Sequence, residues 1–206
     1  MGNEGLIYST ILGNSADVMG AILQLYLPNG GRIADLTMHT GAFWRKADRG
    51  KYEVVGSDIE RYPGVHVLAD LGNTPYRNDS FDMAILDPPY GNGSSVPRTD
   101  FGSSYNLPST MGSEAINATY RMGIGESQRI CRPNGTIVVK CQPIVNSGKN
   151  QWTDIECYHI ARMFDLEITD RFMLLPKTRG RLNKGQTQRH ARKWGSFFWV
   201  FTKRKA

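Results

Sequence analysis

The sequence predicts one doubly wound α/β domain over residues 1–206, with a seven-stranded, mostly parallel sheet whose last strand is antiparallel. Two observations predict this fold class. Short apolar runs alternate with helix-like segments, as they do in a parallel sheet that is covered by helices on both faces. The final two apolar runs have no clear helix between them, which predicts that the last strand runs against its neighbours. A chain of 206 residues is long enough to bury one such core.

The predicted elements follow one another in a regular order. Strands are expected in seven runs rich in apolar residues, at 32–37, 53–58, 65–70, 81–87, 136–140, 166–175 and 196–202. Helices are expected at 42–49, 113–132 and 153–164, with Thr153 as the N-cap of the last one. The sequence Pro133-Asn134-Gly135 predicts a turn between the second helix and the strand that follows it.

Two long segments, 91–112 and 177–195, fit neither a strand nor a helix. The first is rich in Gly, Ser, Pro, Asn and Thr, and the second in Arg, Lys, Gln and Gly. Both follow predicted strands, and ligands of open α/β sheets bind beyond the carboxyl ends of the strands. We therefore expect two substrate-facing loops and no separate target-recognition domain.

Positive charge is concentrated at the C-terminal end of the chain. Residues 171–206 contain eleven Lys and Arg residues and no Asp or Glu, so the rest of a chain with net charge +6 carries −5. A basic end on an acidic body predicts a polyanionic partner. His190 and Trp194 are candidates to stack on a base, although Trp194 equally suits a core position under the last strands. The candidate phosphate contacts are Lys177, Arg179, Arg181, Lys184, Arg189, Arg192 and Lys193.

Several classes of protein are disfavoured. No apolar run approaches the roughly 18 residues that cross a bilayer, and the N-terminus lacks the pattern of a secretory signal. Cys131, Cys141 and Cys157 are odd in number and lack the close spacing of metal ligands. We therefore expect a cytoplasmic protein with reduced thiols, no membrane partner and no metal site.

Acidic residues end successive predicted strands, namely Asp35, Asp58, Asp70 and Asp87. At the carboxyl ends of neighbouring parallel strands, they would line one edge of the sheet. Asp58 follows Asp35 by 23 residues, near the spacing at which an acidic residue accepts the ribose hydroxyl groups of a nucleotide. The pattern predicts a nucleotide-like cofactor at this edge.

The turn Asp87-Pro88-Pro89-Tyr90 carries the most specific chemistry. Two prolines make the turn rigid, so the Asp87 carboxylate and the Pro88 carbonyl become two fixed acceptors beside the aromatic face of Tyr90. An exocyclic amino group on a flat ring has two N–H donors and a lone pair that is delocalised into the ring. Hydrogen bonds to both acceptors would direct that lone pair toward a methyl donor and stabilise the cation that forms on nitrogen.

The same residues resemble the motifs of the amino-methyltransferases that act on adenine N6 or cytosine N4, from Arg32 to the C-terminus. Asp87-Pro88-Pro89-Tyr90 resembles their catalytic motif. The stretch Asp35-Leu36-Thr37 to Gly41-Ala42-Phe43-Trp44 resembles their cofactor loop, with His39 in place of the first glycine. The resemblance implies a Rossmann-like class I fold with S-adenosylmethionine as the cofactor, catalysis by Asp87, Pro88, Pro89 and Tyr90, and cofactor contacts by Asp35, Thr37, Gly41, Phe43, Asp58, Ile59, Asp70, Leu71 and Asp87.

The resemblance implies methylation of a base in DNA. Asp at the first position of the motif favours adenine N6 over cytosine N4. An RNA base amino-methyltransferase would use the same turn and the same basic surface. A nucleic-acid-binding relative with weak cofactor binding is the third alternative, and His39 is its main support. Target recognition would come from the two long loops, a protein partner or a homodimer.

Overall fold

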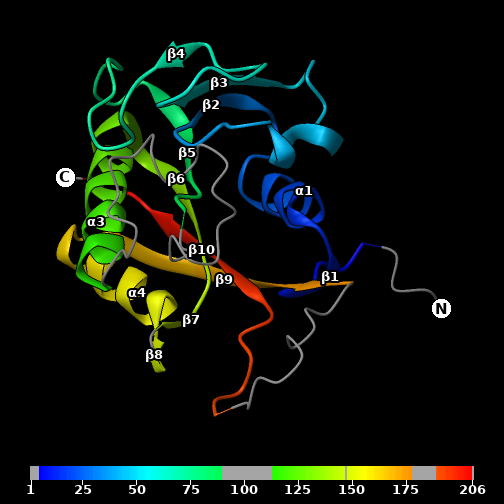
Figure 1. Cartoon of the computed structure of the whole chain (residues 1–206). Helices are drawn as coiled ribbons and strands as arrows, with labels where there is room; N and C mark the ends of the chain where they lie inside the picture. Colours follow the sequence, from blue (N-terminus) through cyan, green and yellow to red (C-terminus); the bar gives the residue numbers. More distant parts are fainter. Residues whose placement is uncertain (1–4, 90–112, 147, 178–188, 206) are drawn as a thin grey trace.

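Among the residues described in this computed structural model, eight strands form the central sheet (Figure 1). The structure describes residues 5–89, 113–146, 148–177 and 189–205. In their order across the sheet, the strands are β1 (Thr10–Gly13), β9 (Glu167–Pro176), β10 (Ser196–Thr202), β6 (Cys131–Cys141), β5 (Phe81–Leu86), β2 (Gly31–Asp35), β3 (Tyr52–Asp58) and β4 (Val67–Leu68). Strand β10 is antiparallel to both β6 and β9, whereas the other pairs of this sheet are parallel.

The predicted fold class is confirmed, but the sheet has eight strands rather than the seven expected. The additional strand, β1, pairs in parallel with β9 at the edge of the sheet. A two-stranded hairpin of β7 (Ile144–Asn146) and β8 (Lys149–Gln151) was also not expected. The run at 65–70 forms only the two-residue strand β4, although the His66 and Ala69 N–H groups also donate to carbonyl groups of β3, and Asp70 forms an isolated bridge with Asn73.

Helices cover both faces of the sheet, with α1 (Ser15–Tyr26) on one side and α3 (Ser113–Ile130) and α4 (Thr153–Met163) on the other (Figure 1). Helix α1 was not predicted, although Asn14 and Asp17 form a complete capping box at its start. The helix expected at 42–49 is only a 3₁₀ turn, η1 (Ala42–Lys46). It begins after the left-handed Gly41 and ends where the backbone becomes extended at Ala47.

Helix α4 also begins differently from the prediction. Thr153 is its first residue rather than its N-cap, and Trp152 takes the N-cap position without a capping side-chain hydrogen bond. Trp152 therefore stands at the start of the helix, and the residue is 48% exposed.

Side chains that alternate along the central strands build one core on each face. Ala84 and Leu86 of β5 belong to the core under α3, whereas Met83 and Ile85 belong to the core under α1. The strands β6 and β10 alternate in the same way. Burial on both faces explains the continuous apolar runs within these strands, Met83-Ala84-Ile85-Leu86, Ile137-Val138-Val139 and Phe198-Trp199-Val200-Phe201. In the described ranges, no helix is long and apolar enough to cross a bilayer.

Helix α3 packs closely over β5 because of a glycine in its middle. A Cβ atom on Gly123 would lie 2.6 Å from Leu86 Cδ1 and 2.9 Å from Leu71 Cδ1. Both leucines are buried, so the Gly123→Ala substitution should lower the free energy of unfolding by about 1–3 kcal/mol. Urea unfolding would measure the change.

Gly20 in α1 is the matched control, because a Cβ atom there meets nothing within 4 Å. The Gly20→Ala substitution should raise the free energy of unfolding by about 0.5–1 kcal/mol, since alanine favours the helix. Equal effects of the two substitutions would contradict the close packing of α3 on β5.

Candidate active site

The carboxyl ends of β5, β2 and β3 bring three acidic residues to one edge of the sheet. Asp35, the last residue of β2, pairs in register with Ile85 of β5 and with Gly56 of β3. Asp58 ends β3, and Asp87 directly follows β5. Asp70 follows β4 on the same side, in a turn in which its Oδ1 accepts the Gly72 N–H at 2.8 Å. The four acidic residues of the sequence pattern therefore end neighbouring strands.

Asp35 fixes the loop that follows β2. Its side chain is buried, and its two oxygens accept hydrogen bonds from the Trp44 indole N–H at 2.7 Å and from the Thr37 backbone N–H at 3.1 Å. Burial raises the pKa of Asp35 to about 7, although both hydrogen bonds act in the opposite direction. With 1% exposure, Asp35 acts through the loop that it positions.

The same loop turns back through two residues in the left-handed region, His39 at φ 41° and Gly41 at φ 65°. The first of these is the position at which the sequence departs from the glycine of related motifs. Histidine occupies it at an energetic cost, since a side chain in this region is less favourable than in the right-handed one. The ring of His39 packs edge-on against Tyr62, with the ring centroids 4.3 Å apart.

Asp58 joins this loop to β3. Its Oδ2 accepts the His39 N–H at 2.8 Å, and its Oδ1 accepts the Glu60 N–H at 3.2 Å. A carboxylate has about four acceptor sites, so these two bonds leave capacity for ribose hydroxyl groups. The carboxylate is nevertheless mostly covered, with the residue 5% exposed, so a ligand would approach it from one direction.

Asp87 has one satisfied and one unsatisfied carboxylate oxygen. Its Oδ2 accepts a hydrogen bond from the Lys140 ammonium at 2.7 Å, whereas Oδ1 is buried and has no hydrogen-bond partner among the residues that the structure describes. Its backbone N–H donates to Thr37 Oγ1 at 2.8 Å, which ties the predicted catalytic turn to the loop after β2. Burial raises the pKa of Asp87, and Lys140 partly offsets that effect. An unpaired buried acceptor is costly, so Oδ1 is a candidate contact for a substrate donor.

Lys140 is the residue of the site that the sequence reasoning missed. It lies near the end of β6, and its side chain is 13% exposed. Its ammonium lies 5.6 Å from the ring centroid of Phe43 and 5.9 Å from that of Phe198. A lysine at the end of an otherwise apolar central strand, Ile137-Val138-Val139-Lys140, was the available signal.

The other predicted site residues differ in their surroundings. Phe43 is buried and meets Phe198 edge-on, and Leu71 is buried in the core under α3. Ile59 is partly buried beside Asp58. In the motif itself, Pro88 is buried and Pro89 is partly exposed. Tyr90 and the segment 91–112 lie outside the described residues.

The basic segment is described only at its two ends. Lys177, Arg189 and Arg192 are exposed, and Lys193 is partly buried. Arg179, Arg181 and Lys184 lie outside the described residues. Ser196, at the start of β10, pairs with Leu174 near the end of β9, so the segment leaves and rejoins the sheet at neighbouring points. Those points are on the same edge as Asp87, because β9 runs parallel to β6 and β5.

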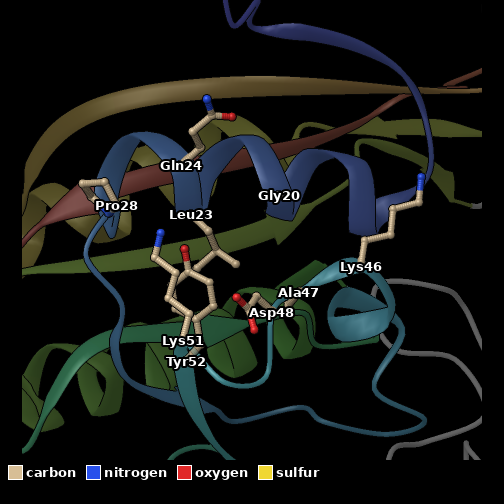
Figure 2. Close-up of a pocket in the computed structure, with 9 residues that line it drawn as sticks. All are labelled: Gly20, Leu23, Gln24, Pro28, Lys46, Ala47, Asp48, Lys51 and Tyr52. Atoms are coloured by element: carbon tan, nitrogen blue, oxygen red, sulfur yellow. The ribbon is translucent and has the colours of Figure 1, made fainter. Parts of the chain in front are cut away.

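A pocket of about 290 Å³ lies elsewhere, between α1 and the start of β3 (Figure 2). Gln24, Lys46, Asp48 and Lys51 contribute polar groups to a lining that also includes Leu23, Pro28, Ala47 and Tyr52. It adjoins Tyr52, at the amino end of β3, whereas Asp58 is at the carboxyl end. This pocket is therefore not part of the acidic edge. Among the described residues, no group of three or more His, Cys, Asp or Glu side chains is arranged to hold a metal ion.

Comparison with solved structures places the chain in one fold. A SAM-dependent methyltransferase from Methanosarcina mazei is similar at a TM-score of 0.54 and 13% identity, over 89% of this chain and 97% of that one. The 1,6-didemethyltoxoflavin-N1-methyltransferase of Burkholderia thailandensis, solved with S-adenosylhomocysteine, is similar at a TM-score of 0.53 and 12% identity, over 93% of this chain and 79% of that one. The (4+2)-cyclase SpnF is similar at a TM-score of 0.58 and 12% identity, over 93% of this chain and 81% of that one.

These likenesses show the fold, which is that of class I SAM-dependent methyltransferases. The similarity to a cyclase shows that the fold by itself does not determine the reaction, so function has to be argued from the site. The chain matches no protein-family model and no curated protein sequence.

Because the pKa of Asp35 is raised, we expect the difference in free energy of unfolding between the wild type and an Asp35→Asn variant to depend on pH. Between about pH 4 and pH 7 the folded protein keeps a proton on Asp35 that the unfolded chain has lost, so folding becomes less favourable as the pH rises. The Asp35→Asn variant lacks this titration. Relative to the variant, the wild-type free energy of unfolding should fall by at most about 4 kcal/mol over this range, at about 1.4 kcal/mol per pKa unit.

Urea unfolding of both proteins at pH 4 and pH 8 would measure this difference. The asparagine keeps only one oxygen for the Trp44 and Thr37 donors, so the variant starts at a disadvantage at pH 4. A difference that stayed constant between the two pH values would show that Asp35 ionises normally in the folded protein.

Proposed function

We propose that this protein is an S-adenosylmethionine-dependent methyltransferase that methylates the exocyclic amino group of a nucleic-acid base, with adenine N6 in DNA as the favoured target. One observation carries the proposal. At the carboxyl end of the central strand β5, Asp87 presents a buried oxygen that has no partner in the described part of the chain, while Lys140 holds its other oxygen. A single acceptor of fixed direction, followed by two prolines, suits an N–H donor of a flat ring.

The residues at the sheet edge fit the proposed cofactor. Asp58 has acceptor sites left for ribose hydroxyl groups, and the exposed Asp70 stands one strand further along, where an adenine amino group could be bound. The left-handed turn at His39 and Gly41 holds the backbone of the loop close to Asp58. When bound, S-adenosylmethionine supplies an electrophilic methyl group. The likeness to methyltransferases of known structure supports this choice of cofactor.

Asp87 is the residue that acts on the nucleophile. Its Oδ1 would accept one N–H of the amino group and the Pro88 carbonyl would accept the other, so that the nitrogen lone pair is held in one direction. The carboxylate charge stabilises the positive charge that develops on nitrogen. Because burial raises the pKa of Asp87, its Oδ1 is also suited to receive the proton that the nitrogen then loses.

Lys140 acts through Asp87. Its ammonium engages Oδ2, which orients the carboxylate and leaves Oδ1 to the substrate. It also favours the ionised form of a carboxyl group that burial would otherwise neutralise. The proposed role of Asp87 therefore depends on Lys140.

The nucleic-acid partner is supported by charge. Exposed Lys177, Arg189 and Arg192 stand on a segment that begins and ends at the same edge of the sheet as Asp87. Phosphates around the target nucleotide would be held there, while the base is extruded toward the acidic edge. RNA offers the same phosphates and the same amino groups, so it is the second candidate substrate.

Product identification tests this function. The protein would be incubated with S-adenosylmethionine carrying a labelled methyl group and with DNA or RNA, and the digested nucleosides would be separated by chromatography. We expect label in N6-methyldeoxyadenosine. Label in an RNA nucleoside would transfer the proposal to RNA, and absence of label from both, with cofactor binding intact by calorimetry, would contradict it.

Variants of the ion pair separate catalysis from stability. The Asp87→Ala substitution should abolish methyl transfer and also lower the free energy of unfolding by about 3–5 kcal/mol, because it removes the carboxylate that pairs with the largely buried Lys140 ammonium. Adding Lys140→Met should restore most of that stability but none of the activity. Thermal unfolding and single-turnover methyl transfer would measure the two effects.

Lys140→Arg is the control for this pair, since it keeps the positive charge. It should retain more activity than Lys140→Met. If Asp87→Ala kept wild-type turnover, or if the double variant regained it, Asp87 would not contact the amino group.

A further inference from the structure

The hairpin β7–β8 and the end of the basic segment meet beside β6. The hairpin begins shortly after Cys141, the last residue of β6. The Gln142 side-chain amide donates to the Lys193 carbonyl at 3.1 Å, and His190 Nε2 lies 2.7 Å from the Gly148 carbonyl oxygen. The described end of the basic segment is therefore fixed against the hairpin.

An exposed tryptophan lies at this junction. Trp152 directly follows β8 and is 48% exposed, although a tryptophan side chain is normally mostly buried in the protein. The Lys193 ammonium lies 4.6 Å from the centroid of its ring. An aromatic face and a cation thus stand together at one point of the surface.

This combination is the chemistry of single-stranded nucleic-acid binding. A base stacks on an aromatic side chain, and a cation beside it pairs with the adjoining phosphate. Further positive charge lies close in the sequence, since Lys149, Arg189 and Arg192 are all exposed within a few residues of Trp152 or Lys193. Base stacking does not depend on which base is present, so such a site adds affinity rather than sequence preference.

The position of Trp152 relates it to the proposed active site. Lys140, whose ammonium contacts Asp87, lies two residues before Gln142, which contacts Lys193. The contacts Asp87–Lys140, Gln142–Lys193 and Lys193–Trp152, together with the two chain steps from Lys140 to Gln142, connect the aromatic ring to the proposed catalytic carboxylate. A nucleotide that neighbours the target nucleotide would come to this part of the surface.

We propose that Trp152 and Lys193 bind an unpaired base and its phosphate next to the target nucleotide. The inference rests on the proposed function in taking a nucleic acid as the substrate, and it adds a second base contact outside the catalytic turn. A base in a regular duplex stacks on its own neighbours, so this site favours single-stranded nucleic acid or a strand that is opened around the target.

Fluorescence anisotropy with a labelled single-stranded oligodeoxynucleotide tests the proposal on the full-length chain. Trp152→Leu keeps an apolar side chain but removes the ring, and should weaken binding by about 5- to 100-fold. Trp152→Phe keeps a ring and should retain most of the affinity. Met163→Ala, which trims another exposed apolar side chain at the far end of helix α4, should leave binding unchanged.

Two further measurements isolate the base and the charge. An oligonucleotide that has the same backbone without bases should bind the wild type and Trp152→Leu equally. Lys193→Gln should lower the slope of binding against salt concentration by about one unit, as expected for one lost phosphate contact.

Each other outcome has a distinct meaning. If wild type and Trp152→Leu bind the base-containing strand equally, the inference is overturned while the proposed function stands. If the wild type binds no nucleic acid, the nucleic-acid part of the proposed function fails and the inference fails with it. If Trp152→Leu instead abolishes self-association in analytical ultracentrifugation and leaves strand binding unchanged, the ring belongs to a contact between copies.

Discussion

The ion pair between Asp87 and Lys140 is the interaction on which the proposed site depends. Removing two charges from water is expensive, and an ion pair that is largely buried recovers this cost only with good geometry and further support. Groups from several elements stabilise the ion pair. The Phe43 and Phe198 rings flank the ammonium, Thr37 Oγ1 accepts the Asp87 N–H, and the Tyr120 hydroxyl on α3 donates to the Lys140 carbonyl at 3.1 Å. The pair therefore links β5, β6, α3 and the loop after β2, while one carboxylate oxygen remains without a partner.

The sheet order explains why such a site can form. Placing β5 between β2 and β6 brings the loop after β2 and the end of β6 to the same carboxylate, and parallel pairing puts all three carboxyl ends at one edge. Unfavourable local features concentrate there as well. Asp35 is buried, His39 takes a left-handed conformation, and Asp87 keeps an unpaired oxygen. Local costs of this kind persist where the surrounding structure holds them in place, and they are typical of functional sites.

The sequence was sufficient for the fold class and for placing acidic residues at the ends of neighbouring strands. Runs rich in apolar residues made β2, β3, β5, β6, β9 and β10 detectable, and burial on both faces explains the longest of these runs, in β5, β6 and β10. Strand β1 was not detectable in this way, since its four residues are at most half-buried at the sheet edge. Helix α1 could have been found from Asn14 and Asp17. Lys140 pairs with a residue 53 positions away, and the exposure of Trp152 depends on how the hairpin packs, so neither follows from local pattern.

The most direct test of this account is the ionisation of Asp87 itself, followed by carbon-13 NMR of its carboxyl group, with Asp87→Asn used for assignment. Burial and the ammonium act on this group in opposite directions. The account predicts a pKa above the usual value of about 3.9 in the wild type and a still higher pKa in Lys140→Met. It would be contradicted by the same midpoint in both proteins, because the Lys140 ammonium would then not hold the carboxylate that is proposed to bind the target amino group.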